Sequence, residues 1–174
     1  RFVTINPVRT GYSAIADEWV PIKPGTDGAL LLALVHEIIA LGLYDREFLA
    51  RYTNAGQLVN QNADSDDFGL MLRNAEGDVV NPLRPANFYW WDRHSQAPVA
   101  DHTEGTDPSL LGHFQMPDGT PAVPAFQLLQ ERVKPYTADW AAGITGIPAD
   151  TIRRLAREMG ITARDQKIEL PIAW

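Results

Sequence analysis

The amino-acid sequence predicts an α/β fold: a mostly parallel sheet with flanking helices in a dinucleotide-binding-like layer, and a loop-rich insertion with a candidate β-hairpin. Short β-prone runs alternate with helical apolar patterns in the first and last parts of the 174-residue chain. Seven prolines and poor apolar periodicity mark residues 61–125 between them. We therefore expect an α/β domain whose first part is 1–60, an acidic, loop-rich insertion over 61–123, and the helical return and closing strand of the domain over 124–174.

The first segment begins with two predicted strands. Phe2–Ile5 is a short β-prone run that ends at Asn6-Pro7, because proline cannot donate to a β-ladder. Arg9–Ala16 is predicted to be a short helix or turn, and Trp19–Ile22 a second strand. Lys23–Thr26, with proline and glycine at its centre, predicts a turn.

Two helices are expected after this turn. The run Gly28–Leu41 is apolar around most of its circumference, so we expect a largely buried helix. Thr26 or Asp27 is its expected N-cap, and Gly42 is its expected C-terminal stop. Asp45–Tyr52 predicts a second, shorter helix.

The middle of the chain shows little regular patterning. Phe68–Arg73 and Asp78–Val80 flank Ala75-Glu76-Gly77, which predicts a β-hairpin, and residues 81–123 are expected to be irregular. Residues 61–125 hold ten acidic and three basic residues, a net of −7, so this part carries the whole net charge of the chain.

The last segment is predicted to be helical with a closing strand. Apolar spacing favours helices over Val123–Val133 and Ala138–Ile144. A third helix is expected to begin at Pro148, which the first helical turn tolerates, and to end at Gly160. Its apolar stripe comprises Ile152, Leu155, Ala156 and Met159. Lys167–Trp174 is predicted to be the closing strand.

Composition limits the chemistry of this chain. It contains no cysteine, which excludes disulfides, thiolate metal ligands, cysteine nucleophiles and iron–sulfur ligation by these residues, and leaves the cellular compartment open. A net charge of −7 without a long basic run argues against nucleic acid as a partner. The longest apolar stretch, Gly28–Val35, is followed at once by His36 and Glu37, so no membrane contact is expected from this segment.

Two loops after the predicted strands are candidate binding elements. Asn6–Thr10 follows the first strand and Lys23–Asp27 the second, and ligands of open α/β sheets bind beyond the carboxyl ends of the strands. Free N–H groups at the start of a helix favour an anion or a polar nucleotide edge. The Asp27 carboxylate can accept two parallel hydrogen bonds, the pattern that guanine offers with its N1–H and 2-amino group. Alternatively, Asp27 only caps the helix and Gly25 only makes the turn.

The same loops carry a resemblance to a known family. The matching segments are Ile5–Thr10, Ala16–Asp27, Leu43–Leu49, Tyr136-Thr137, Trp140–Pro148 and Ile152–Arg157. In this order they resemble the molybdopterin oxidoreductases of the dimethyl-sulfoxide-reductase superfamily, whose cofactor is bis-(molybdopterin guanine dinucleotide). The resemblance covers about residues 2–53 and 124–174, and the middle of the chain carries no motif of the family.

The resemblance implies that this α/β domain grips the guanine dinucleotide of molybdopterin. The loop after the first strand is implied to meet the nucleotide, and the turn before the long helix to hold the guanine, with Asp27 as the recognising carboxylate. The implied cofactor-binding residues are Asn6, Pro7, Arg9, Thr10, Gly25, Thr26 and Asp27. Many relatives have Asp-Pro-Arg where this chain has Asn6-Pro7-Val8, so the contact at position 6 lacks a charge here.

The resemblance also implies a parent enzyme larger than this chain. We expect a fragment of a catalytic subunit, inactive alone, because the chain offers no ligand for molybdenum or tungsten; an iron–sulfur cluster of the parent is expected outside these residues. Expected partners are the remaining domains, a small-molecule substrate and an electron-transfer subunit. The parent is expected to perform two-electron oxygen-atom transfer or dehydrogenation, as formate dehydrogenases and sulfoxide or amine-oxide reductases do.

Two other functions are compatible with the sequence. One is a stand-alone, non-catalytic α/β nucleotide-binding or interaction module. The other is a small hydrolase that uses the His- and Asp-rich middle, although the chain lacks a Gly-x-Ser-x-Gly pattern. The spacing of His94, His102 and His113 fits no metal motif, and His36 is expected to be a core histidine. The aromatic run Phe88–Trp91 either lines a substrate funnel, docks on another domain or packs locally.

Overall fold

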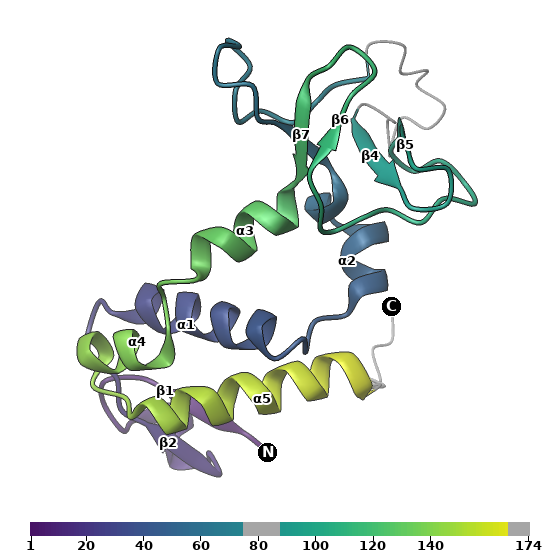
Figure 1. Ribbon diagram of the computed structural model, residues 1–174. Coiled ribbons are helices and arrows are strands. Elements are labelled where there is room, and N and C mark those ends of the chain that lie inside the picture. Colours follow the sequence, from purple (N-terminus) through teal and green to yellow (C-terminus); the bar gives the residue numbers. More distant parts are fainter. Residues whose placement is uncertain (75–87, 167–174) are drawn as a thin grey trace. The chain divides into compact units, whose positions relative to one another are not determined.

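The computed structural model describes residues 1–74 and 88–166 of the chain (Figure 1). The chain divides into two compact units. The first comprises Arg1–Tyr44 with Arg132–Trp174, and the second comprises Asp45–Glu131. The assignment of residues 61–123 as an insertion stays a prediction.

A short parallel sheet begins the first unit. β1 (Val3–Ile5) pairs with β2 (Glu18–Val20) in parallel, so that Val3 lies opposite Glu18 and Ile5 opposite Val20. A 3-10 turn over Gly11–Ala14 connects the two strands. The predicted strands and the short helical turn between them are confirmed, with the second strand one or two residues earlier than expected.

Three helices pack together in the first unit (Figure 1). They are α1 (Asp27–Ala40), α4 (Ala138–Thr145) and α5 (Ala149–Asp165). Their buried residues form one core with the end of β2: Val20, Ile22, Leu30, Ala33, Leu34, Ala138, Ala141, Ile147, Ile152, Leu155 and Ala156. The side chain of Thr137 caps α4 by accepting the N–H of Trp140 at 3.2 Å. Gly146 ends α4 at φ 79°, a conformation that glycine adopts without strain.

Two predictions about these helices need correction. α5 does not end at Gly160 but continues to Asp165, and Gly160 packs against Leu43 so closely that an added Cβ would lie 2.7 Å from the Leu43 Cβ. Glycine therefore serves close packing here rather than helix termination. α1 is buried on one side only, because Leu31 is 59% and Leu32 36% exposed.

The second unit contains a three-stranded antiparallel sheet and a separate hairpin. The sheet has the order β3 (Leu58–Asn60), β7 (Pro121–Pro124), β6 (Phe114–Gln115). The hairpin pairs β4 (Tyr89–Asp92) with β5 (Ala97–Ala100). The prediction of an irregular 81–123 is therefore wrong for its described part. These strands are two to four residues long and two of them contain proline, so apolar alternation did not reveal them.

The strand pairing also corrects the predicted sheet. Among the described residues, β1–β2 is parallel and the other three strand pairs are antiparallel. The sheet structure is therefore mixed rather than mostly parallel. The predicted hairpin around residues 75–77 lies partly outside the described ranges, and the predicted closing strand Lys167–Trp174 lies wholly outside them.

Two further helices complete the described chain. α2 (Arg46–Tyr52) begins after Asp45, whose side chain accepts the N–H of Phe48 at 2.9 Å. α3 (Ala125–Val133) follows β7 directly. Within residues 1–74 and 88–166, no helix has both the length and the apolar character that a membrane span requires.

Candidate functional site

The loop after β1 is organised by the side chain of Asn6. Its Nδ2 donates to the Oγ of Ser13 at 2.9 Å, and Ser13 is almost fully buried. The indole Nε1 of Trp19 donates to the Oδ1 of Asn6 at 3.0 Å and to its main-chain carbonyl at 3.1 Å. The Asn6 amide is thus part of the scaffold of the loop, with one N–H and one oxygen lone pair left for another partner.

The rest of this loop faces solvent. Pro7, Arg9 and Thr10 are exposed. Thr10 precedes the 3-10 turn without capping it through its side chain. The Arg9 guanidinium makes no ion pair with any residue that the structure describes, so its charge is available to an anionic ligand such as a phosphate.

The turn after β2 presents the Asp27 carboxylate. Gly25 adopts φ 75°, which makes the predicted turn, and the N–H and hydroxyl of Thr26 donate to the carbonyl of Lys23 at 3.3 Å and 2.7 Å. Asp27 is the first residue of α1 and is exposed. Its carboxylate accepts no hydrogen bond from the described residues, and the side chain of Thr26 makes no capping bond either. The interpretation of Asp27 as a mere helix cap therefore has no hydrogen bond in its favour.

Both loops leave the sheet at the same edge. Parallel strands place their carboxyl ends together, and the N–H of Asn6 donates to the carbonyl of Val20, the last residue of β2, at 3.3 Å. The N–H of Lys23 donates to the carbonyl of Thr145 at 3.0 Å, which ties the start of the turn to the end of α4. The seven residues predicted from the sequence therefore lie on two loops that are anchored to one end of the same unit.

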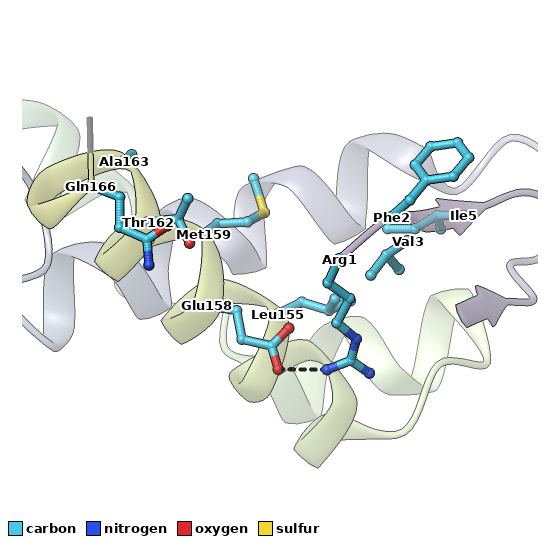
Figure 2. Close-up of a pocket in the computed structure, with 10 residues that line it drawn as sticks. All are labelled: Arg1, Phe2, Val3, Ile5, Leu155, Glu158, Met159, Thr162, Ala163 and Gln166. Atoms are coloured by element: carbon cyan, nitrogen blue, oxygen red, sulfur yellow. Dashed lines mark hydrogen bonds and ion pairs between the residues drawn. The ribbon is translucent and has the colours of Figure 1, made fainter. Parts of the chain in front are cut away.

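Two grooves in the structure are separate from these loops. One runs between β1 and α5 (Figure 2), and the other lies in the second unit beside Asn60 and Phe88. None of the seven predicted residues lines either groove. Five of the seven residues are exposed, and the other two, Asn6 and Thr26, are half-buried.

The aromatic run in the middle of the chain packs locally. Trp90 is buried, and the ring of Trp91 stacks on Phe114 with centroids 4.4 Å apart and planes 8° from parallel. The guanidinium of Arg73 lies 5.5 Å from the ring centroid of Phe88. Of the three alternatives for this run, these contacts favour local packing.

Asp92 holds the acidic middle together. Its buried carboxylate accepts the N–H groups of Asp107 at 2.8 Å, Ser95 at 2.8 Å and His94 at 3.3 Å, and the Ser95 hydroxyl at 2.7 Å. The bond from the Asp107 N–H, followed by those from Ser95, holds the pKa of Asp92 far below its ordinary value. This carboxylate is occupied by the chain itself, and no group of three or more His, Asp or Glu in the described ranges is placed to hold a metal.

Sequence reasoning missed Ser13 and Trp19, which position Asn6. A half-buried tryptophan beside a loop needs a partner for its indole N–H, and this requirement was the available signal. His36 was expected to be a core histidine; it is half-buried rather than buried, and its Nδ1 lies 3.0 Å from the carbonyl of Val133.

Comparison with curated proteins finds relatives along the whole chain. A sulfite dehydrogenase subunit of Allochromatium vinosum is 62% identical over 174 residues, which are 100% of this chain and 18% of that protein. The alpha subunit of a perchlorate reductase from Dechloromonas aromatica is 33% identical over 91% of this chain and 20% of its own length. Dimethyl sulfoxide reductase of Escherichia coli is 31% identical over 93% of this chain and 14% of its own length.

Comparison with solved structures finds a similar chain, whereas comparison with family models finds none. Acetylene hydratase from Pelobacter acetylenicus is 23% identical, with a TM-score of 0.46 over 98% of this chain and 14% of that chain. No protein-family model matches the sequence. The chain spans about one fifth or less of the length of the curated relatives above.

The homologues of this chain are catalytic subunits of oxidoreductases, and the chain corresponds to a segment of such a subunit. More narrowly, they are the molybdopterin catalytic subunits of the dimethyl-sulfoxide-reductase family, and this chain belongs to that family. The resemblance carried by the two loops and the helical return is thereby confirmed.

Proposed function

We propose that this chain holds a guanine nucleotide of the molybdopterin cofactor within the catalytic subunit of a molybdenum oxidoreductase. The observation that carries the proposal is the exposed Asp27 carboxylate, which accepts no hydrogen bond from the described residues. It stands at the start of α1, on a turn that leaves the sheet at the same edge as the Asn6 loop.

The hydrogen-bond acceptors and the cation of these loops match the polar groups of a guanine nucleotide. Two carboxylate oxygens of Asp27 match the N1–H and 2-amino group of guanine. The remaining lone pair of the Asn6 amide can accept a ribose hydroxyl. The guanidinium of Arg9, which makes no ion pair with the described part of the chain, matches a phosphate. Pro7, Thr10, Gly25 and Thr26 shape the two loops around these groups.

The role of the chain is to bind and orient. When bound, the molybdopterin cofactor supplies two-electron chemistry at molybdenum, with tungsten as the alternative metal. The whole protein is proposed to carry out oxygen-atom transfer or dehydrogenation on a small molecule, with the metal held by its remaining domains and electrons passed to an electron-transfer subunit. The 62% identity to a sulfite dehydrogenase subunit makes sulfite the first substrate to test, before formate, sulfoxides and amine oxides.

The guanine contact is tested by Asp27→Asn in the intact catalytic subunit. The variant keeps the size of the side chain but removes a charge-assisted pair of hydrogen bonds, worth about 1.5–3 kcal/mol. We expect the guanine nucleotide released by acid hydrolysis, measured per polypeptide, to fall by about tenfold or more. Asp66→Asn is the matched control, because Asp66 is also exposed and makes no hydrogen bond to the described residues. Full nucleotide content in Asp27→Asn would refute the contact.

The substrate is tested separately by oxidation of sulfite in the intact enzyme with an artificial electron acceptor. Turnover of formate or a sulfoxide without turnover of sulfite would reject sulfite while leaving the guanine contact standing.

A further inference from the structure

Thr145 is the last residue of α4, and its polar side chain is fully buried. Its hydroxyl donates to the carbonyl of Ala141 at 2.8 Å and accepts the N–H of Ile147 at 3.1 Å. Ala141 and Ile147 belong to the apolar core of this unit, where an unpaired hydroxyl would be costly. The two hydrogen bonds therefore link the last turn of the helix to the chain that follows it.

The carbonyl of Thr145 holds the start of the turn that carries Asp27. Carbonyls in the last turn of a helix have no partner within that helix, and this one accepts the N–H of Lys23 at 3.0 Å. Its direction depends on the backbone between Thr145 and Ile147, which the bond from Ile147 to the Thr145 hydroxyl fixes. Gly146 supplies the left-handed conformation between them, at φ 79°.

A packing contact joins the same two segments. A Cβ added to Gly146 would lie 3.4 Å from the Cε and 3.7 Å from the Cγ of Lys23. The aliphatic stem of Lys23 therefore passes close to the main chain of Gly146. The end of α4 and the start of the turn thus meet through a hydrogen bond and through packing at adjacent residues, although they lie far apart in the sequence.

Further hydrogen bonds connect Lys23 to the start of α1. The carbonyl of Lys23 accepts the N–H of Thr26 at 3.3 Å and its hydroxyl at 2.7 Å. The carbonyl of Thr26 then accepts the N–H of Ala29 at 3.0 Å, in the first turn of α1. Asp27 lies within this series of bonds, but its carboxylate makes no hydrogen bond to residues 1–74 or 88–166. The position of the carboxylate therefore depends on the main chain of the turn.

We propose that Thr145 is a positioning residue for Asp27: its buried hydroxyl fixes the carbonyl that holds the turn, so that the Asp27 carboxylate is in place before a guanine nucleotide binds. This role rests on the proposed function of Asp27. Thr145 is fully buried and acts only through the main chain of the turn. A turn that is already ordered loses less conformational entropy on binding than a mobile one, and it therefore binds more tightly.

Thr145→Val in the intact catalytic subunit tests this proposal. Valine has nearly the shape of threonine but leaves the N–H of Ile147 without its partner. We expect the guanine nucleotide released by acid hydrolysis, measured per polypeptide, to fall by about threefold or more. Thr145→Ser keeps the hydroxyl and is expected to retain the nucleotide. Ile152→Val is the matched control, because Ile152 is equally buried in the same core, and it is also expected to retain the nucleotide.

The same substitution in an Asp27→Asn background separates positioning from a general loss of stability. If Thr145 acts through Asp27, Thr145→Val causes no further loss of nucleotide once Asp27 is replaced. A further loss as large as in the unsubstituted subunit would overturn the proposal.

Two other outcomes distinguish this role from the guanine contact itself. Loss of nucleotide in Asp27→Asn without loss in Thr145→Val overturns the positioning role alone. Full nucleotide content in Asp27→Asn refutes the guanine contact and the positioning role with it. If Thr145→Val does not fold, Thr145→Ala replaces it with the same expectations, because the smaller side chain leaves room for a water molecule at the N–H of Ile147.

Discussion

The indole of Trp19 holds the side chain of Asn6 in place, with the Nε1 of Trp19 at 3.0 Å from the Oδ1 of Asn6. A second bond from the same Nε1 reaches the main-chain carbonyl of Asn6 at 3.1 Å. On the other side, the Nδ2 of Asn6 donates to the buried Ser13. One side chain of β2 thereby sets the conformation of the loop that follows β1.

Trp19→Phe is expected to loosen this loop. The substitution keeps an aromatic ring but removes both hydrogen bonds to Asn6, which lowers the free energy of unfolding by about 1 kcal/mol. Urea unfolding measures the loss. Trp140→Phe is the control, because the indole N–H of Trp140 makes no hydrogen bond to the described residues. Equal losses in the two variants would show that the bonds to Asn6 contribute nothing specific.

Gly160 and Gly143 offer a matched pair of helix glycines. A Cβ at Gly160 would collide with Leu43, whereas a Cβ at Gly143 meets nothing within 4 Å. Gly160→Ala is expected to destabilise the chain by about 1–3 kcal/mol through overpacking. Gly143→Ala is expected to stabilise it by about 0.5–1 kcal/mol, since alanine has the higher helix propensity. Thermal unfolding of both variants checks the prediction, and a stabilised Gly160→Ala would contradict the close contact with Leu43.

The hydrogen bonds to Asp92 predict a pH-dependent contribution to stability. Folding lowers the pKa of this carboxyl, so its contribution is fully present above its ordinary range near pH 4 and is lost as the pH falls toward the folded-state value. Asp92→Asn is expected to lower the free energy of unfolding at pH 7 by about 2 kcal/mol. The difference from the unsubstituted chain should shrink below about pH 4.

Urea unfolding between pH 7 and pH 3 measures this difference for Asp92→Asn. The exposed Asp66→Asn serves as the control and should show no comparable change with pH. A destabilisation by Asp92→Asn that stays constant down to pH 3 would contradict the assigned role of the ionised carboxylate.

Arg46 ties α2 to the segment after β5. Its Nη2 donates to the Oδ1 of Asp107 at 2.8 Å and to the carbonyl of Pro108 at 2.9 Å. Arg46→Met is expected to cost about 1 kcal/mol, because the pair is only partly buried. Arg51→Met breaks a more exposed pair with Glu47 and is expected to cost close to nothing. Urea unfolding measures the loss of stability in each variant. Equal losses would show that the Arg46 contacts contribute no more than an exposed ion pair.

Local sequence signals predicted the helices of the first unit well. Gly146 and the capping Thr137 bound α4 because both act within a few residues of the chain. The helix end predicted at Gly160 was wrong, because this residue is small to make room for Leu43, which lies more than a hundred residues earlier in the sequence. Such a contact becomes visible only when the fold has brought the two residues together.

The two loops that carry the proposed site were predictable in their position along the chain, but their internal hydrogen bonds were not. The turn glycine Gly25 and the exposed Asp27 follow from sequence pattern and strand topology. The bonds of Asn6 to Ser13 and Trp19 depend on how two loops meet, which composition and spacing do not encode. The short strands β4 to β7 were not predicted for another reason: two to four residues are too few to show an alternation of apolar and polar residues.

Because the N–H of Lys23 donates to the carbonyl of Thr145, the conformation of the turn and the proposed binding by the turn depend on different atoms. Main-chain atoms anchor the start of the turn to α4, while the side chain of Asp27 makes no hydrogen bond to residues 1–74 or 88–166. Selection can therefore exchange the residue at position 27, and with it the base that the turn prefers under the proposed function, without a matching repair elsewhere in the unit. Recognition at this position is free to diverge while the scaffold stays constant.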